Sequence, residues 1–210
     1  FCTLLEGVYT SLHNIVTSES MMHSSRFLRS ATKSFVNRAV ALIPHPEKFH
    51  RGGEDAFIAH KRIVSVADGV GGYGESGVNP AIFTRQVMEF SLNACLRNSD
   101  RTAQQVLQEG VKETLSKRTV GGCPVTMAVM LPNSRMSILN LGDCATYVLR
   151  RDAQAGLTVL YRTTEQQHYF NCPYQLPTDH PSDGCSAVLA VEDGDIVFQA
   201  SDGVTDNVYF

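Results

Sequence analysis

Acidic residues stand at the ends of short apolar β-type runs at four separate places in the chain. The motifs are Glu54-Asp55, Asp68-Gly69, Gly142-Asp143 and Asp202-Gly203. A single Asp-Gly pair is weak evidence, because this dipeptide is also favoured in tight hairpin turns, and Asp193-Gly194 fits that reading. Four acidic motifs at strand ends are difficult to explain as turns alone, so the sequence predicts carboxylates gathered at one end of a sheet.

Carboxylates gathered from distant segments repel one another, so we expect a cation between them. Hard divalent ions such as Mg²⁺ and Mn²⁺ prefer oxygen ligands. In a two-metal site the ions lie about 3.5–4 Å apart and share a carboxylate. Asp68 suits that bridging role, and Gly69 allows its own carbonyl to approach a cation. The motifs therefore predict a dinuclear metal site that performs hydrolysis.

Composition limits the classes of protein to which the chain can belong. The chain has 210 residues, of which 43% are hydrophobic, enough for one sizeable globular domain. The net charge is -3, and no basic stripe is interleaved with aromatic residues, so a nucleic-acid partner is not expected. No apolar run approaches the ~20 residues that a membrane span requires. We expect a monomer without a membrane span.

The compartment is only partly indicated. The six cysteines are scattered without a C-x-x-C pair, which favours free thiols in a reducing, intracellular setting. Residues 20–46 contain no acid but several basic residues and serines, loosely like a mitochondrial or plastid transit peptide. A solvated basic segment is the alternative and leaves a cytoplasmic or nuclear location open. Because the chain starts at Phe1 and not at Met, we expect its natural N-terminus upstream.

Apolar periodicity predicts the following elements. Residues 1–30 are an N-terminal extension, either targeting or linker, and residues 34–43 are a first strand that ends at Pro44. A hairpin, two adjacent helices and a strand meander follow. The strands are expected at residues 56–59, 63–67, 125–131, 136–141, 145–150, 157–163 and 196–200. This order favours an α+β fold with antiparallel sheet and segregated helices.

Capping residues locate the two helices. Asn79 followed by Pro80 predicts the start of the first, and the second is expected after Thr102. The side chains expected on their buried faces are Phe83, Val87, Phe90 and Ala94 for the first, and Ala103, Leu107, Val111 and Leu115 for the second.

The motifs GEDAF, VADGVGG, LGD and ASDGVTDN occur in this order. Together they resemble the metal-dependent protein serine/threonine phosphatases of type 2C, the PPM family. The segment EQQHYFNCPYQL at residues 165–176, with Pro44-His45-Pro46 upstream, resembles the organelle-associated subgroup found in mitochondria and plastids. The resemblance covers residues 34–210.

The resemblance implies a four-layer α/β/β/α sandwich with two antiparallel sheets, formed by residues 31–210 as a phosphatase-like domain. It implies two Mn²⁺ or Mg²⁺ ions, with a third in many members. Each ligand role is carried over by motif: Asp68 bridges, Glu54 and the carbonyl of Gly69 serve one ion, Asp202 serves the other, and Asp143 and Asp206 hold the third. Asp55 would orient water. A metal-activated water would then hydrolyse phosphoserine or phosphothreonine in a phosphoprotein substrate.

Several positions depart from the family pattern. Many members carry a histidine directly after the bridging Asp-Gly, where this chain has Val70. Either a metal-bound water or another group such as His168 is then expected to protonate the leaving group. Lys48 and Arg51 are the candidates for binding the substrate phosphate. The family continues beyond Asp202 to a further metal-binding Asp, so we expect the chain to be truncated at its C-terminus.

Val70 and that expected truncation keep an alternative open. It is a catalytically impaired pseudophosphatase that binds a phosphoprotein or another partner. Another two-metal hydrolase, such as a nuclease, is disfavoured by the lack of a basic patch.

Overall fold

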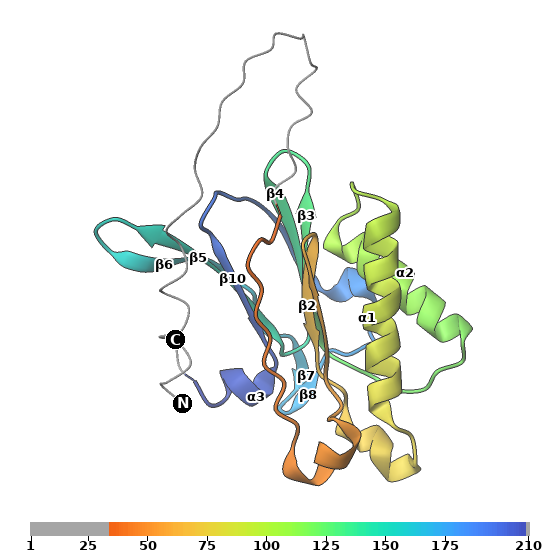
Figure 1. Cartoon of the computed structure of the whole chain (residues 1–210). Coiled ribbons are helices and arrows are strands. Elements are labelled where there is room, and N and C mark those ends of the chain that lie inside the picture. Colours follow the sequence, from red (N-terminus) through yellow and green to blue (C-terminus); the bar gives the residue numbers. More distant parts are fainter. Residues whose placement is uncertain (1–33, 209–210) are drawn as a thin grey trace.

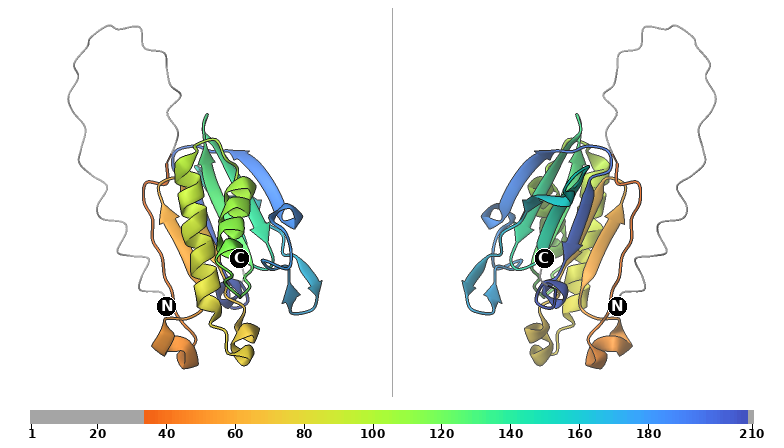
Figure 2. Two further views of the ribbon diagram at one scale, coloured as in Figure 1. Left: turned by 90° about the vertical axis from the view of Figure 1, so that its right-hand side faces the viewer. Right: turned by 90° about the vertical axis from the view of Figure 1, so that its left-hand side faces the viewer.

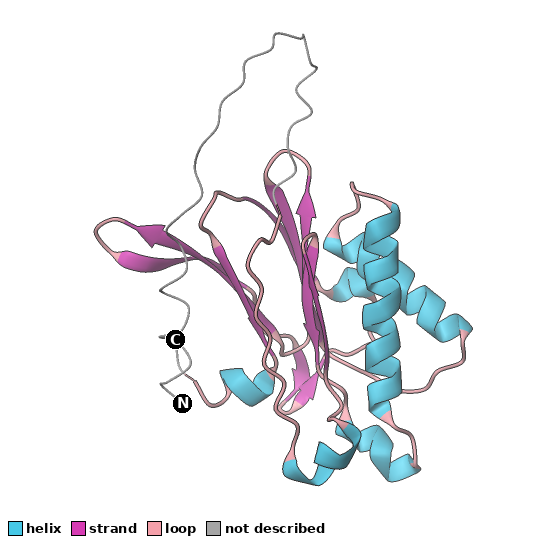
Figure 3. Ribbon diagram, viewed as in Figure 1, coloured by secondary structure: helices cyan, strands magenta, loops and turns pink. Residues whose placement is uncertain are grey.

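Two packed β-sheets and a helical layer form the body of the molecule. The computed structural model describes residues 34–208. Two long helices lie against one face of a five-stranded sheet, and a three-stranded sheet packs on its other face (Figures 1 and 2). In Figure 3, the strands of both sheets lie on the same side of the two long helices.

Both sheets are antiparallel throughout. The larger has the order β1-β2-β3-β4-β9, with the strands β1 (Ala56–His60), β2 (Ile63–Ala67), β3 (Val125–Leu131), β4 (Arg135–Leu141) and β9 (Cys185–Ala190). The smaller has the order β10-β5-β6, with β5 (Ala145–Asp152), β6 (Gly156–Arg162) and β10 (Ile196–Ala200). A separate hairpin joins β7 (Gln167–Tyr169) to β8 (Cys172–Pro173).

The helices begin where their caps predict. In α1 (Pro80–Arg97) the Asn79 side chain accepts a hydrogen bond from the Ala81 N–H. In α2 (Ala103–Ser116) Thr102 and Gln105 form a reciprocal capping box. A single turn, α3 (Asp202–Thr205), follows β10, and short 3₁₀ helices lie at η2 (Pro46–Arg51), η3 (Gly71–Ser76) and η4 (Pro181–Asp183). Local capping chemistry therefore sets both long-helix starts.

The core has two parts, one on each face of the larger sheet. Helix α1 packs on β1 and β2, and α2 packs on β3 and β4. Between the sheets, Met136, Ile138 and Val148 belong to a second apolar cluster. All seven residues of β3 are buried because this strand lies between the helices and the second sheet. A strand covered on both faces is continuously apolar and does not alternate.

The α+β class and the two antiparallel sheets confirm the prediction. Within residues 34–208 the long helices cover one outer face of the sandwich, so the four-layer arrangement stays a prediction. Of the predicted helix faces, Phe83 and Leu107 are buried. Phe90 is half-buried, and Leu115 is exposed, contrary to expectation.

The strand predicted at residues 34–43 is wrong. This segment is irregular, and its one backbone hydrogen bond among the described residues runs from the Phe35 N–H to the Lys61 carbonyl at 2.9 Å. Val36 and Ile43 are exposed, so the apolar run buries no continuous face. Residues 1–30, the predicted extension, lie outside the described part of the chain.

Strand β9 and the β7–β8 hairpin were not predicted. Neither has a fully buried residue. The sequence of β9, CSAVLA, is mostly apolar, but so short an apolar run does not by itself identify a strand, and β7 and β8 are too short to show an alternating pattern. Among residues 34–208, no helix combines the length and hydrophobicity needed to cross a lipid bilayer.

Candidate metal centre

The register of the first hairpin brings two of the acidic motifs together. In the β1–β2 pair, Ala56 lies opposite Ala67. Asp55 directly precedes Ala56 and Asp68 directly follows Ala67, so the two carboxylates meet one position beyond the ladder. Their side chains are hydrogen-bonded.

The other two motifs reach the same end through the connection between the sheets. In the larger sheet, Ala67 lies opposite Val125, which lies opposite Leu141. Gly142 and Asp143 follow Leu141 and lead the chain into β5 of the smaller sheet. There Ala145 pairs with Ala200, two residues before Asp202. The antiparallel registers therefore place all four acidic motifs at one end of the sandwich.

Asp68 is the centre of this acidic cluster. Its side chain is hydrogen-bonded to both Asp202 and Asp55. Burial, followed by repulsion from Asp55 and Asp202, raises the pKa of Asp68 to about 9. Burial also raises the pKa of Asp55, although hydrogen bonds from Asp68 and from the Gly69 N–H oppose that rise. The fold thus holds negative groups closer together than they would stay in water.

Asp143 lies beside this group. Burial, followed by repulsion from Asp202 and to a lesser degree from Glu165 and Asp206, raises the pKa of Asp143 to about 6. Its Oδ1 atom is buried and has no hydrogen-bond partner among the described residues. A buried carboxylate oxygen without a partner is costly. Asp206 stands one turn after Asp202, and its N–H donates to the Asp202 carbonyl at 2.9 Å.

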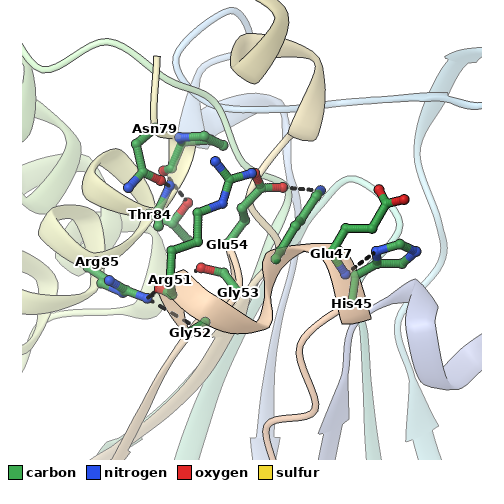
Figure 4. A network of polar contacts seen from close by, with 12 residues as sticks. His45, Glu47, Arg51, Gly52, Gly53, Glu54, Asn79, Thr84 and Arg85 are labelled. Carbon is green, nitrogen blue, oxygen red and sulfur yellow. Dashed lines mark hydrogen bonds and ion pairs between the residues drawn. The ribbon is translucent and has the colours of Figure 1, made fainter. Parts of the chain in front are cut away.

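Glu54 is turned towards two cations. Its carboxylate forms ion pairs with the Lys48 ammonium and, at 2.7 Å, with the Arg51 guanidinium. The Glu54 side chain is 3% exposed, whereas those of Lys48 and Arg51 are about one-third exposed, at 33% and 34%. Figure 4 shows Arg51 beside Glu54 at the end of the η2 turn. The predicted phosphate-binding residues therefore neutralise a predicted metal ligand.

Gly69 allows the two hairpin ends to touch. A Cβ atom at this position would lie 2.3 Å from the Glu54 carbonyl oxygen and 2.8 Å from the Glu54 Cβ. Contacts this short are not tolerated, so any other residue would push the Asp68 and Glu54 segments apart. The Asp-Gly pair here serves close packing of two backbones.

Arg85 is a site residue that the sequence did not indicate. It extends from α1, and its guanidinium lies 3.3–3.5 Å from the carbonyl oxygens of Arg51, Gly52 and Gly53 (Figure 4). These carbonyls belong to the turn that leads into Glu54 and Asp55. An isolated arginine on a helix carries no such signal, because its partners lie 32 to 34 residues away in sequence.

His168 lies in the β7–β8 hairpin and has structural partners. Its Nε2 is 3.0 Å from Asp179 Oδ1, and its ring stacks on Tyr174 with centroids 4.2 Å apart. These two contacts explain the position of the His168 side chain, and no catalytic role is needed to account for it.

The residues present fit hard divalent cations. The donor set is made of oxygen atoms, the carboxyl pKa values of Asp55, Asp68 and Asp143 are raised by crowding in a buried place, and Asp143 has an unpartnered oxygen. Among residues 34–208, however, no three acidic, histidine or cysteine side chains are arranged around one point to hold an ion. The carboxylates instead bond to one another, and Glu54 bonds to its two cations.

Proteins similar to this chain are protein phosphatases. No family model matches the chain. A probable protein phosphatase 2C from Oryza sativa subsp. japonica is 32% identical over 198 residues, which cover 90% of this chain and 58% of that relative. The chain thus spans less than two-thirds of this relative's length.

Two solved structures share the fold. The photosystem II phosphatase PBCP has a TM-score of 0.69 and 31% identity, covering 80% of this chain and 67% of that one. The catalytic domain of the serine/threonine phosphatase PstP, solved with two manganese ions, has a TM-score of 0.55. At 17% identity it shows likeness of fold alone, over 85% of this chain and 79% of that one. This chain belongs to the type 2C protein phosphatase family.

Proposed function

We propose that the protein is a metal-dependent phosphatase that hydrolyses phosphoserine and phosphothreonine in phosphoproteins. The observation that carries this proposal is the contact of Asp68 with both Asp55 and Asp202, in a buried place that raises the pKa of Asp68 to about 9. The fold gains nothing from such repulsion unless a cation offsets it. The membership of the chain in the type 2C family supports the same function.

We assign the ligand roles by residue. Asp68, Glu54, Asp202 and the carbonyl of Gly69 would hold two Mn²⁺ or Mg²⁺ ions, and Asp143 and Asp206 a third. When bound, the ions supply Lewis acidity that lowers the pKa of a water and offsets phosphoryl charge. Asp143 fits this set because its buried Oδ1 lacks a partner among the described residues.

The remaining residues would position the water and the phosphate. Asp55 accepts a hydrogen bond from the Gly69 N–H, which holds its carboxylate in place to orient a water. Lys48 and Arg51 are the nearest cations to Glu54. These two side chains would also bind the substrate phosphate, to which a guanidinium can donate two hydrogen bonds. Such pre-positioned charge is the largest contribution expected in phosphoryl transfer.

His168 is not assigned the acid role. Its Nε2 is occupied by Asp179, and Val70 has no proton to give, so water is the proposed proton donor to the leaving alkoxide. We further propose a monomeric, organelle-associated protein. The likeness to a photosystem II phosphatase supports the organelle-associated part of that proposal.

The test is hydrolysis of a phosphopeptide by the full-length protein with and without Mn²⁺. Asp68→Asn and Asp202→Asn should each lower the rate about a hundredfold or more. The control variant Asp152→Asn changes an exposed carboxylate at the end of β5 and should leave the rate unchanged. Activity that survives EDTA, or is indifferent to both site variants, would overturn the proposal. Phosphopeptide binding without hydrolysis would instead indicate the pseudophosphatase.

A further inference from the structure

The turn of the β7–β8 hairpin carries two exposed aromatic side chains. Phe170 is 93% exposed, and the neighbouring Tyr169 is 72% exposed. Phe170 has the highest exposed fraction among the large hydrophobic side chains of the described residues. Single exposed apolar residues are ordinary, but adjacent exposed aromatics at a turn are typical of a contact surface. Asn171, with φ of 58°, closes the tight turn that directs them outward.

The base of this hairpin is braced. The His168 ring stacks on Tyr174 with an interplanar angle of 19°, and His168 Nε2 contacts Asp179 at 3.0 Å. Asp179 also accepts a hydrogen bond from the Gln175 N–H at 2.8 Å. The aromatic tip is therefore held out by a supported base. A pre-ordered surface loses less conformational entropy when it binds a partner.

One arm of the hairpin is joined to the loop that carries Asp143. The Gln166 N–H donates to the Gly142 carbonyl at 3.0 Å. The Tyr174 carbonyl lies so close to Gly142 that a Cβ there would be 2.3 Å from it. The residue just before β7, Gln166, is therefore bonded to the residue just before Asp143.

The second arm is joined to the loop beside Asp68. Leu176 and Cys123 exchange two backbone hydrogen bonds of 3.0 Å. The neighbouring Gly122 carbonyl accepts from the Val70 N–H, two residues after Asp68. Figure 1 shows β7 and β8 at the same end of the sandwich as α3, which begins at Asp202.

We propose that Tyr169 and Phe170 bind an apolar side chain of the phosphoprotein substrate near its phosphorylated residue. This inference rests on the proposed phosphatase function. Phe170 is four positions beyond Gln166 at the base, which spans at most about 13 Å at ~3.3 Å per residue. An extended substrate covers that distance in about four residues. The preferred apolar residue is therefore expected about three to five positions from the phosphoserine or phosphothreonine.

The experiment compares substrates that do and do not reach the hairpin. The full-length protein with Mn²⁺ is given phosphopeptides that carry one Leu or Phe at successive positions, an all-Ala peptide, and p-nitrophenyl phosphate. The variants are Phe170→Ala, Tyr169→Ala and the partial variant Phe170→Leu. The control is Leu157→Ala, which changes a 52% exposed side chain on β6.

We expect Phe170→Ala to lower kcat/KM about tenfold on the apolar-flanked peptides, mainly by raising KM. Rates on p-nitrophenyl phosphate and on the all-Ala peptide should be unchanged, and Phe170→Leu should retain part of the preference. Leu157→Ala should behave as the wild-type protein. Because Phe170 and Tyr169 are exposed, the variants should also retain the wild-type melting temperature.

Three results would overturn the inference. One is equal activity of wild type and variants on every peptide. Another is an equal loss on p-nitrophenyl phosphate, which would indicate a damaged metal centre. The third is a dimer in sedimentation that Phe170→Ala converts to a monomer, which would make the tip a contact between copies. A wild-type protein that hydrolyses none of these substrates would overturn the proposed function itself, and this inference with it.

Discussion

Asp55 and Asp68 face each other one position beyond the Ala56–Ala67 pair that ends the β1–β2 ladder. Antiparallel pairing makes this meeting unavoidable once the two-residue turn at Lys61 and Arg62 sets the register. The backbone pairing thereby holds the two side chains in contact. The metal-free protein should therefore be sensitive to the protonation of this pair.

The metal-free protein should lose stability as pH rises. The pKa of Asp68 is about 9 in the folded chain, against an ordinary value of about 3.9 when unfolded. Between these values the folded state holds a proton that the unfolded state has released, so the free energy of unfolding falls with rising pH. We expect the melting temperature in EDTA to fall by about 5 °C or more from pH 5 to pH 8.

Asp68→Asn should remove most of that fall, because an amide does not titrate. The control Asp152→Asn should leave it unchanged, since two backbone N–H groups hold the pKa of Asp152 below its ordinary value and keep it ionised throughout this range. Adding excess Mn²⁺ to the wild-type protein at pH 8 should raise its melting temperature again. A melting temperature that rises from pH 5 to pH 8 in EDTA would contradict this account.

Gly69→Ala should damage the site through packing alone. The new Cβ would lie 2.3 Å from the Glu54 carbonyl oxygen, so the two backbones must separate. We expect a loss of about 1–3 kcal/mol in urea denaturation and weaker Mn²⁺ binding by calorimetry. Gly72→Ala is the matched control, because a Cβ there has no neighbour within 4 Å. Equal losses in the two variants would show that the close approach at Gly69 is unimportant.

Lys48→Met should destabilise the metal-free protein. It removes one of two cations from Glu54, whose side chain is 3% exposed. A buried carboxylate with reduced compensation should cost about 1–3 kcal/mol in urea denaturation. Arg97→Met is the comparison, since Arg97 is 51% exposed and pairs with Glu109 between the helices. That change should cost less than about 1 kcal/mol, and a larger loss there than in Lys48→Met would refute the prediction.

Phe83→Ala should test the packing of α1 on the larger sheet. Phe83 is fully buried, and Gly121 lies against its side chain so closely that a Cβ there would be 2.4 Å from the Phe83 Cβ. We expect a loss of about 3–5 kcal/mol. Its neighbour Ile82 is 50% exposed on the same helix, and Ile82→Ala should cost less than about 1 kcal/mol by the same denaturation measurement.

Much of the fold was predictable because its signals are local. The Asn79 and Thr102 caps mark the helix starts, and the run at residues 125–131 is a strand with those bounds. Strand β9 was missed although its sequence, CSAVLA, is mostly apolar, because so short an apolar run does not by itself identify a strand. Residues 34–43 have the composition of a strand but do not form one, since a strand also requires a partner along its length.

The positions of the acidic residues at strand ends, and the order of their motifs that is typical of the type 2C family, can be read from the sequence. How these residues meet depends on the packing of the folded chain. Glu54 bonds to Lys48 and Arg51, Asp143 keeps an oxygen without a partner among the described residues, and Arg85 reaches a turn more than thirty residues away. Caps and periodicity act over a few residues, whereas the partner of a charge depends on the packing of segments that the chain brings together only when it folds.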